Sequence, residues 1–531
     1  MLTAKQTAPA VKKSEPRMPI RVFNTLSKNK EPLEPVKPGH VGIYLCGPTV
    51  YKPSHIGHMV GPVIFDAVKR YLAYSGYQVT LVINITDVDD KLIKESHERK
   101  MSMAALAEEM TADYMRNLAA MGVDSVDHFP RATDNMDEII KLTSSLIAKG
   151  FAYESDGDVY FDVARDPQYG KLSNRDVASM LGEGGEMAER KRSPADFALW
   201  KSAKPGEPSW ESPWGKGRPG WHIECSAMSR RILGESFDIH GGGLDLVFPH
   251  HENEIAQSEC CHGKPMAKYW MHNGLMQASN QVGKLGGRAT RDADAGDQQT
   301  QEAGKLGKSK GASAFADLLS RHAPETIRFF LLSTHYRRPI DFSEERIAEV
   351  NTGLEQFYRF FKRYERITGK SFYAIDQAQT RPAGDFEPGD DATLKQIAEH
   401  RRKFLEAMDD DFNTGGAVGD LFELVRALNK FADDEKLENR QPEQRQLDVL
   451  LRGALTLREL GATLGLFRVP AVKPTLGNNA VVDHLMGLVI ELRAGARAKK
   501  DFATADRIRQ VLGEAGISLE DRPGGTEWTL K

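Results

Sequence analysis

"VGIYLCGPTVYKPSHIGHMVGPVIFDAVKRYLAYSGYQVTLVINI", residues 41–85, is the stretch that decides the fold class. It opens on "VGIYL", which is rich in β-branched and aromatic residues, and continues with the turn residues of "GPTVYKPSHIGH". Residues 61–76 then have helical periodicity, and residues 77–85 form a nearly continuous apolar run. Strand, turn, helix and strand in this order predict a βαβ unit with a right-handed crossover. We therefore predict an α/β protein built on a doubly wound parallel sheet.

The bulk composition is that of an ordinary soluble globular protein. The chain has 531 residues, of which 40% are hydrophobic and 27% charged, and this length predicts roughly three or four domains. No apolar run approaches the ~18 residues of a membrane span, and the N-terminal segment lacks the apolar stretch of a signal peptide. We therefore expect a cytoplasmic protein without a membrane partner. The formal net charge of −4 argues against wholesale wrapping of nucleic acid, although local basic patches could still bind it.

Changes in composition along the chain predict its division into parts. Residues 180–220 are crowded with glycine and proline and alternate charge with tryptophan, which predicts an inserted, loop-rich module. Residues 279–313 have the polar, glycine-rich composition of a mobile loop, and a linker is expected at 467–479. The predicted boundaries are 1–18 for a disordered tail, 19–140 and 221–345 for the two halves of the sheet domain, 141–220 for the inserted module, 346–470 for a helical bundle, and 480–531 for a small C-terminal unit.

Four dispersed residues have the chemistry of a zinc site. Cys46 follows the first predicted strand, Cys225 lies in "GWHIECSAM", and His250 and Glu254 lie in "PHHENEIAQ". On a helix that starts after Pro249, His250 and Glu254 are one turn apart on the same face. Together with thiolates from two strand ends, this pair would complete a tetrahedral Cys₂HisGlu zinc site. Taken singly, each cysteine also fits a small buried hydrophobe, and the His/Glu pair also fits a solvated helix face.

Two further clusters have the chemistry of a phosphate site. His55, Gly57 and His58 follow a strand and precede a helix, where backbone N–H groups and the helix dipole favour an anion. Imidazoles at this place could stabilise charge that develops on a phosphoryl group, although a turn with two surface histidines fits equally well. Lys305 and Lys308 lie three residues apart in "KLGKS", within the predicted mobile loop. Such a loop can close on a triphosphate, but a charged loop is more often simply solvated.

Together these motifs resemble the class I aminoacyl-tRNA synthetases, and within that class the cysteinyl-tRNA synthetases. The resemblance covers most of residues 40–345 and returns near the C-terminus, and it implies a Rossmann-type catalytic domain, a helical bundle and a small anticodon-binding unit. It rests on motifs that occur in the family's order: "YLCGPTVYKPSHIGH" (44–58), "NITDVDDK" (84–91), "GWHIECSAM" (220–228), "DIHGGGLDLVFPHHENEIAQSE" (238–259), "MDDDFNTGGAV" (408–418) and "AKKDFATADRIRQVL" (498–512).

The resemblance also implies a role for each candidate residue. One zinc ion per chain would be held by four ligands and would bind the thiolate of substrate cysteine. The family's "HIGH" signature would bind ATP, and its lysine loop would act on the triphosphate. In this sequence the zinc ligands are Cys46, Cys225, His250 and Glu254; the ATP residues are His55, Gly57, His58, Lys305 and Lys308, with Gly243 and Asp245 near the ribose; and the cysteine pocket has Thr86, Trp221 and His240.

The expected reaction has two steps at one site. The carboxylate of L-cysteine attacks the α-phosphorus of Mg-ATP, and the terminal ribose of cysteine tRNA then attacks the resulting cysteinyl-adenylate. The histidines and the lysine loop would act by electrostatic stabilisation and not by covalent catalysis. The inserted module would meet the tRNA acceptor end, the C-terminal parts would reach the anticodon with Trp528 as one stacking candidate, and the family implies a monomer.

The chain departs from the family pattern in two places. The lysine loop reads "KLGKS" where the family has Lys-Met-Ser-Lys-Ser, and Met59, Val60 and Gly61 follow the "HIGH" tetrad where the family often has an arginine. Two other functions also stay open from the sequence, and the altered lysine loop favours only the second. One is a ligase that transfers cysteinyl-adenylate to a small amine, and the other is a catalytically silent, zinc-containing RNA-binding protein.

Overall fold

The computed structural model describes residues 19–175, 190–278, 314–470, 479–522 and 525–530. The chain divides into two compact units, Met1–Ala471 and Val472–Lys531. The predicted N-terminal tail and the predicted mobile loop at 279–313, which includes Lys305 and Lys308, lie outside the described residues.

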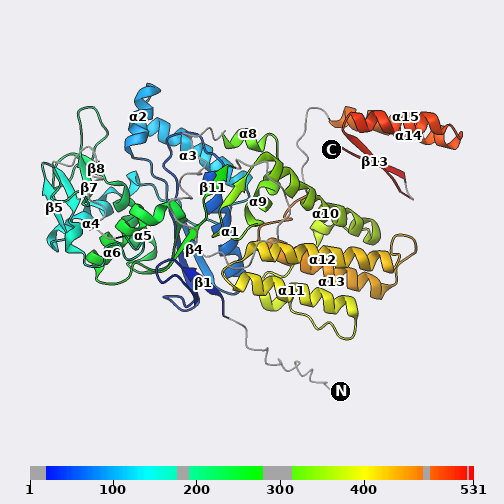
Figure 1. The fold of residues 1–531 in the computed structure, drawn as a ribbon, viewed down its shortest axis with the longest axis horizontal. Helices are drawn as coiled ribbons and strands as arrows, with labels where there is room; N and C mark the ends of the chain where they lie inside the picture. The colour runs from blue at the N-terminus through cyan, green and yellow to red at the C-terminus, as the bar shows by residue number, and fades with distance from the viewer. Residues whose placement is uncertain (1–18, 176–189, 279–313, 471–478, 523–524, 531) are drawn as a thin grey trace, which may run out of the picture. The chain divides into compact units, whose positions relative to one another are not determined.

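The first unit is organised around a parallel four-stranded sheet (Figure 1). Every neighbouring pair in this sheet is parallel, which confirms the predicted α/β class. The strand order is β10-β9-β3-β4, with bounds β3 His40–Leu45, β4 Gln78–Ile83, β9 Phe237–Gly243 and β10 Ala267–Asn273. β3 and β9 form the central pair of the sheet. The strand after β3, which is β4, lies on one side of this pair, and the strand after β9, which is β10, lies on the other, so the order of the strands switches between β3 and β9. Ligands bind at such a switch point, beyond the carboxyl ends of the two strands.

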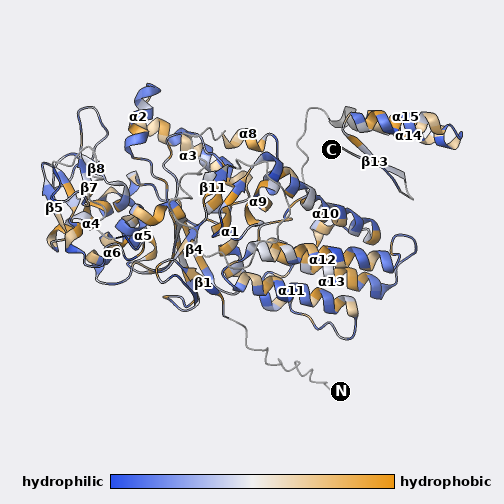
Figure 2. Cartoon of the chain, viewed as in Figure 1, coloured by the Kyte–Doolittle hydropathy of each residue, from blue (hydrophilic) through white to orange (hydrophobic). Residues whose placement is uncertain are grey.

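Helix α1 (Gly57–Tyr74) connects β3 to β4 and lies nearly entirely in the core. It begins four residues before the predicted helical stretch, so Gly57 and His58 belong to its first turn instead of preceding it. Figure 2 shows α1 mostly in the hydrophobic colour, as expected for a helix covered on several sides. The helix ends at Tyr74, and Gly76 follows with a φ of +103°, a conformation that a side chain would disfavour.

The inserted module contains a second sheet, which is antiparallel. The described part of the segment predicted to be loop-rich, at 180–220, consists largely of turns and loop but also contains the strands β7 and β8, which the sequence did not predict. The side chains of Phe197 and Trp200 are buried, and the Phe197 ring stacks on Phe161 at 5.0 Å. Of the tryptophans in this stretch, Trp200 lies in β7, whereas Trp210 and Trp214 lie in the connection between β7 and β8. The sheet order is β5-β6-β7-β8, with bounds β5 Ala152–Ser155, β6 Asp158–Phe161, β7 Phe197–Ser202 and β8 Gly217–Pro219.

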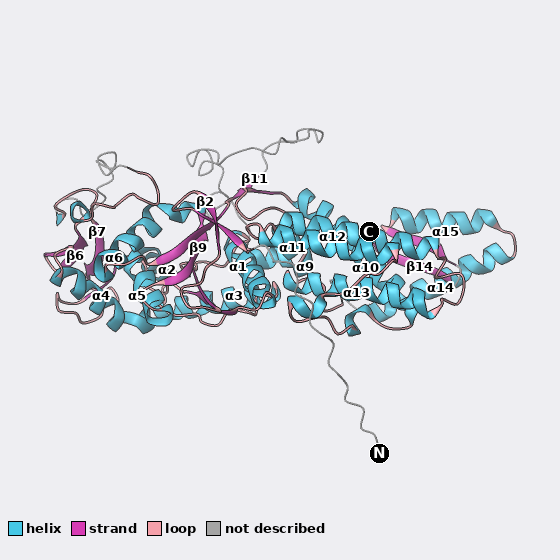
Figure 3. Ribbon diagram, turned by 90° about the horizontal axis from the view of Figure 1, so that it is seen from below, coloured by secondary structure: helices cyan, strands magenta, loops and turns pink. Residues whose placement is uncertain are grey.

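Residues from Pro324 to Phe467 form the predicted helical bundle, whose helices lie side by side in Figure 3. Phe467 is fully buried, with its ring 4.9 Å from Phe357, so it packs in the bundle core and does not begin a linker as predicted. A short parallel strand pair, β11 (Met276–Ala278) and β12 (Ile340–Phe342), precedes the predicted bundle of residues 346–470, and α9 lies before β12. The helices are α9 Pro324–Leu332, α10 Glu344–Thr368, α11 Ala392–Asp409, α12 Thr414–Asp434 and α13 Gln444–Thr463.

The second unit packs two helices against a β-hairpin. Its Arg493 guanidinium is buried and bonds both oxygens of Asp521, at 2.6 and 2.8 Å. Trp528 is half-buried in the hairpin. The bounds are α14 Asn479–Ala498, α15 Phe502–Glu514, β13 Ile517–Arg522 and β14 Gly525–Leu530.

The remaining elements connect these parts. They are β1 Arg21–Asn24, β2 Asn29–Pro32, α2 Asp90–Glu98, α3 Met103–Ala120, α4 Met136–Ala148, α5 Trp221–Leu233, α6 Glu252–His262 and α8 Phe315–Leu319, with short helical turns that include η5 Leu244–Leu246 and η6 Val247–His251. Over the described residues, no helix is both long enough and apolar enough to cross a membrane.

Candidate functional site

The four predicted metal ligands come together from four separate elements at the switch point of the sheet. Cys46 directly follows β3, His250 lies in η6 and Glu254 lies in the first turn of α6. The prediction that Cys225 lies at a strand end is wrong, because it belongs to α5. Gly220 is extended and caps this helix, so Cys225 falls in its second turn and points to the sheet.

The spacing of the ligand atoms fits a tetrahedral zinc ion. The sulfurs of Cys46 and Cys225 are 3.8 Å apart, and Cys46 Sγ lies 3.5 Å from His250 Nε2. Glu254 Oε1 lies 3.5 Å from Cys46 Sγ and 3.0 Å from His250 Nε2. Tetrahedral bonds of about 2.3 Å to sulfur and about 2.1 Å to nitrogen place two sulfurs about 3.8 Å apart, and sulfur and nitrogen about 3.6 Å apart. The donor set and its spacing therefore match the metal that the sequence predicts.

The electrostatics of the cluster favour a cation. Burial alone would raise the pKa of Glu254, but His240 and His250 outweigh it and hold this pKa below its ordinary value. The hydrogen bond from Cys46 lowers the pKa of Cys225, whereas burial and the nearby anions raise the pKa of Cys46. Glu254 and Cys225 also raise the pKa of His250, against the effect of its burial. A carboxylate and a thiolate are thus stabilised next to each other inside the protein.

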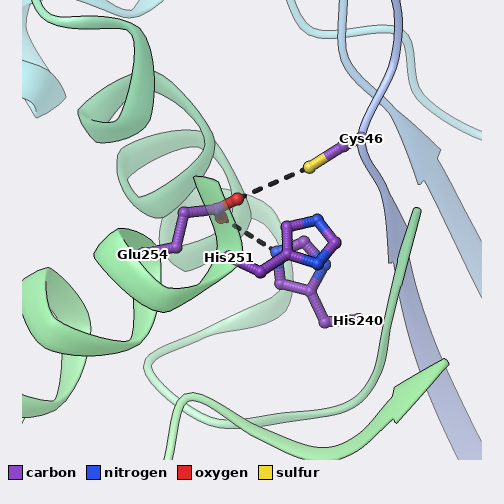
Figure 4. Close-up of side chains that lie close together, drawn as sticks. All are labelled: Cys46, His240, His251 and Glu254. Atoms are coloured by element: carbon purple, nitrogen blue, oxygen red, sulfur yellow. Dashed lines mark hydrogen bonds and ion pairs between the residues drawn. The ribbon is translucent and has the colours of Figure 1, made fainter. Parts of the chain in front are cut away.

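Glu254 connects the ligand cluster to His240 on β9 (Figure 4). Its Oε1 faces Cys46, while its Oε2 accepts a hydrogen bond from His240 Nε2 at 2.9 Å. His251 lies beside this pair, and its Nδ1 is 2.7 Å from His272 Nε2. Cys46, His240, His251 and Glu254 are also close enough to share an ion. The set with two thiolates is the better zinc site, because zinc prefers sulfur ligands and the Nε2 atom of His240 is already engaged.

Two residues of α5 pack on the imidazole of His250. The indole of Trp221 stacks on this ring at 4.3 Å and remains 39% exposed. His222 Nδ1 lies 2.9 Å from His250 Nδ1, so a hydrogen bond orients the His250 ring with Nε2 directed at the cluster. Sequence reasoning assigned no role to His222. Its spacing of three residues from Cys225 on one helix was the signal that could have found it.

Thr86 and Glu224 form a buried pair behind Cys225. Thr86 follows β4, and its hydroxyl donates to Glu224 Oε2 at 3.1 Å. Burial raises the pKa of Glu224 well above its ordinary value, and the neighbouring thiol of Cys225 adds to this rise. Of the three predicted pocket residues, Trp221 and His240 therefore contact ligands directly, while Thr86 is connected to them through Glu224.

The two histidines of the "HIGH" tetrad stack on each other at the start of α1. Their ring centroids are 3.8 Å apart with an interplanar angle of 25°, and both rings are half-buried. The Gly57 N–H donates to His55 Nδ1 at 3.1 Å, and a Cβ atom at Gly57 would lie 2.9 Å from the His55 ring. Glycine at this position therefore lets the imidazole fold over the helix N-terminus.

The predicted ribose residues lie at the end of β9 and just beyond it. Gly243 is the last residue of β9, and Asp245 lies in η5. A Cβ atom at Gly243 would lie 2.5 Å from Asp245 Oδ1, so the carboxylate turns back over the glycine backbone. Both residues are at the carboxyl edge of the sheet, on the strand that also carries His240.

Comparisons with known proteins agree with these motifs. Residues 32–285 match the family described as tRNA synthetases class I (C) catalytic domain, and residues 403–468 match the DALR domain. A cysteine–tRNA ligase of Geobacter metallireducens is 44% identical over 527 residues, which is 97% of this chain and 100% of that protein. A cysteine–tRNA ligase of Heliobacterium modesticaldum is 45% identical over 514 residues, covering 96% of this chain and 99% of that protein.

The fold is also similar to that of a solved structure of low sequence identity. Mycobacterium tuberculosis methionyl-tRNA synthetase in complex with methionyl-adenylate aligns over 80% of this chain and 90% of its own, with a TM-score of 0.56 and 15% identity. At this identity the likeness concerns the fold alone, and it agrees with a Rossmann-like parallel sheet followed by helices.

Proposed function

The chain belongs to the cysteine–tRNA ligase family of the class I aminoacyl-tRNA synthetases, and we propose that Cys46, Cys225, His250 and Glu254 hold the zinc ion that selects its amino acid. The family's reaction is the ATP-dependent attachment of cysteine to tRNA. Its partners are accordingly an amino acid, ATP and a tRNA. The observation that carries the zinc proposal is the set of ligand spacings: the three that involve Cys46 match a tetrahedral ion, while His250 Nε2 and Glu254 Oε1, 3.0 Å apart, would separate slightly to take it.

The proposed zinc ion would bind the substrate thiolate as a soft Lewis acid. A hydroxyl is a harder and more weakly acidic group, so serine would be rejected by chemistry that a pocket of similar size cannot supply. Three interactions within the chain would support this selection. Glu254 is oriented by His240, His250 is oriented by His222, and Trp221 covers the exposed side of the cluster.

The start of α1 is the proposed place of nucleotide activation, with His55 and His58 as electrostatic stabilisers of the α-phosphate. The observation in support is that the two stacked imidazoles lie at the N-terminus of α1, where negative charge is favoured: His55 Nδ1 accepts from the Gly57 N–H, and His58 Nδ1 accepts from the His55 N–H. Mg-ATP would be the substrate form. Gly243 and Asp245 lie at the same edge of the sheet and are proposed to contact the ribose. Lys305 and Lys308 keep their predicted role at the triphosphate.

The inserted module is proposed to meet the tRNA acceptor end, and the C-terminal parts are proposed to reach the anticodon. Since tRNA and ATP are its substrates, we also propose the cytoplasm as its place of action and a monomer as its working form. The curated relatives align over 96–97% of the chain, which includes the long C-terminal region. That region sets the chain apart from the small-amine ligase considered above, which would lack it.

The decisive experiment is ATP–pyrophosphate exchange with cysteine and with serine, together with zinc analysis of the purified protein. The proposal expects about one zinc per chain, exchange with cysteine, and exchange with serine lower by about 10⁴-fold or more. Zinc without any exchange would favour the silent RNA-binding protein. Exchange with cysteine in a protein that contains no zinc would overturn the metal assignment.

A further inference from the structure

Helix α1 reaches from the "HIGH" tetrad to the helical bundle. Its first turn carries Gly57 and His58, and its second half carries Asp66, Tyr71 and Tyr74. The helix has 18 residues, which at about 1.5 Å per residue makes it about 27 Å long. In Figure 1 it lies between the parallel sheet and the bundle helices. One element thus touches both the proposed nucleotide site and a part of the chain that follows it by several hundred residues.

The first contact with the bundle region is a buried ion pair between Asp66 and Arg328 of α9. Asp66 is fully buried and Arg328 is 2% exposed. The same guanidinium donates to the carbonyl oxygen of Leu464 at 2.8 Å, directly after α13, and to that of Met121 at 3.1 Å. Gly465 follows with a positive φ, and a Cβ atom there would lie 2.4 Å from the Arg328 guanidinium. Arg328 therefore joins α1 to the end of the last bundle helix.

Two tyrosines one turn apart make the other contacts. The hydroxyl of Tyr71 lies 2.5 Å from Asp409 Oδ1 at the end of α11, and Tyr74 donates to Glu459 of α13. Arg401 of α11 completes the second contact, because its guanidinium donates to Glu459 Oε1 at 2.8 Å and to the Tyr74 hydroxyl at 3.0 Å. Both tyrosine side chains are buried. Each contact joins α1 to a different helix of the bundle.

These contacts fix the orientation of α1, in addition to the apolar packing that buries it. Apolar packing alone would allow the helix to slide or rotate slightly, whereas buried polar pairs are satisfied in one arrangement only. A tilt of about 5° about the anchored end would move the first turn by about 2 Å over this length. Misplacement of a catalytic group by about 1 Å can lower the rate by about a hundredfold.

We propose that Asp66, Tyr71 and Tyr74 are positioning residues for the activation step, through which the helical bundle fixes His55 and His58 against the nucleotide. The inference rests on the proposed function, because it assumes that these histidines act on ATP. Met59, Val60 and Val63 are buried on both sides of Pro62, so core packing connects the first turn to the anchored part although Pro62 donates no backbone hydrogen bond. The zinc ligands lie on other elements, and the inference therefore predicts that they are unaffected.

The test compares two variants that each remove buried tyrosine hydroxyls at the boundary with the bundle. The first is the double variant Tyr71→Phe/Tyr74→Phe. The matched control is Tyr336→Phe, since the Tyr336 hydroxyl donates to Asp411 Oδ1 at 2.7 Å in the same boundary but is not on α1. Wild type, variant and control are assayed for ATP–pyrophosphate exchange, zinc content, KM for cysteine and the midpoint of thermal unfolding.

The double variant should lower kcat of exchange by about ten- to a hundredfold, with zinc content kept and the KM for cysteine changed less than about twofold. Tyr336→Phe should lower the unfolding midpoint similarly but keep kcat within about twofold. A kcat within about twofold of wild type in the double variant would overturn the inference. So would an equal fall of kcat in the control, because stability would then explain both. If the double variant does not fold, Tyr74→Phe alone is assayed against the same control. Absence of exchange in the wild type would instead contradict the proposed function.

Discussion

The metal-ligand cluster and the start of α1 each hold the side chains of a proposed site in place, but they do so in different ways. The four ligand side chains come from four elements, and three of them are buried to 2% exposure or less. The two histidines of the "HIGH" tetrad come from one turn and are half-buried. The first region is held by packing and hydrogen bonds around it, while the second depends on the placement of a single helix. The proposed selection of the amino acid would thus depend on the core, and the proposed activation would depend on the placement of α1.

The largest expected effect is that of Cys225→Ser. Serine keeps the shape but offers a poorer zinc ligand, so we expect loss of zinc and a fall in cysteine-dependent exchange of about a thousandfold or more. Zinc analysis and exchange kinetics measure both quantities. The control is Cys261→Ser, since Cys261 is equally buried on α6 but lies 3.2 Å from Ser145 Oγ, outside the cluster. A Cys225→Ser protein with full zinc and normal exchange would contradict the assignment of Cys225 to the zinc site.

The next effect is that of His58→Asn, which should lower kcat of exchange by about a hundredfold. The zinc content should stay at the wild-type value, because no ligand of the cluster belongs to α1. Half-buried His40 at the start of β3, whose Nδ1 lies 3.2 Å from the Pro38 carbonyl oxygen, provides the control His40→Asn. Loss of zinc in His58→Asn would show that the two regions are not independent.

A smaller effect is expected for His222→Phe, which keeps an aromatic ring but removes the partner of His250 Nδ1. Loss of such an outer hydrogen bond should weaken zinc binding by about tenfold while the fold is retained. Competition with a chelator of known affinity measures the change. His262→Phe is the control, because His262 lies near Glu235 at the other end of α6. Unchanged zinc affinity would mean that packing alone orients His250.

The smallest expected effect concerns ATP binding after zinc removal. Since the two regions lie on different elements, stripping zinc should abolish cysteine binding but change the affinity for a non-hydrolysable ATP analogue by less than about twofold. Calorimetric titration of the stripped and the zinc-reloaded protein measures both. A tenfold loss of nucleotide affinity on stripping would contradict the separation of the two regions.

The sequence predicted the parts of this molecule that depend on local pattern. The βαβ unit at 41–85 carried its own periodicity, and the spacing of His250 and Glu254 on one helical face needed only local geometry. The helix around Cys225 was missed because "GWHIECSAM" contains few strong helix formers, and residues 223–229 of the helix are buried in the fold, which local sequence does not reveal. The strands at 197–219 were missed because glycine and proline were interpreted as loop signals.

Contacts between distant segments could not be predicted in the same way. Cys46 and Cys225 meet because α5 packs against β3, and the packing of a helix on a distant strand is a property of the whole fold. The contacts of Tyr71 and Tyr74 with the bundle likewise join residues more than 330 positions apart. The family resemblance supplied the ligand set in the first case, and nothing in the local sequence indicated the second.

Glu254 has both carboxylate oxygens engaged, and this restricts which amino acids can stand at position 254 during evolution. Glutamine would present an amide NH₂ either to His240 or to the ligand cluster, and aspartate would fall short by one carbon–carbon bond of about 1.5 Å. Glutamine and aspartate, the two residues most similar to glutamate, would therefore each lose one of these contacts. If Glu254 holds the proposed zinc ion, a change at this position would therefore disturb a metal ligand and the His240 contact at the same time.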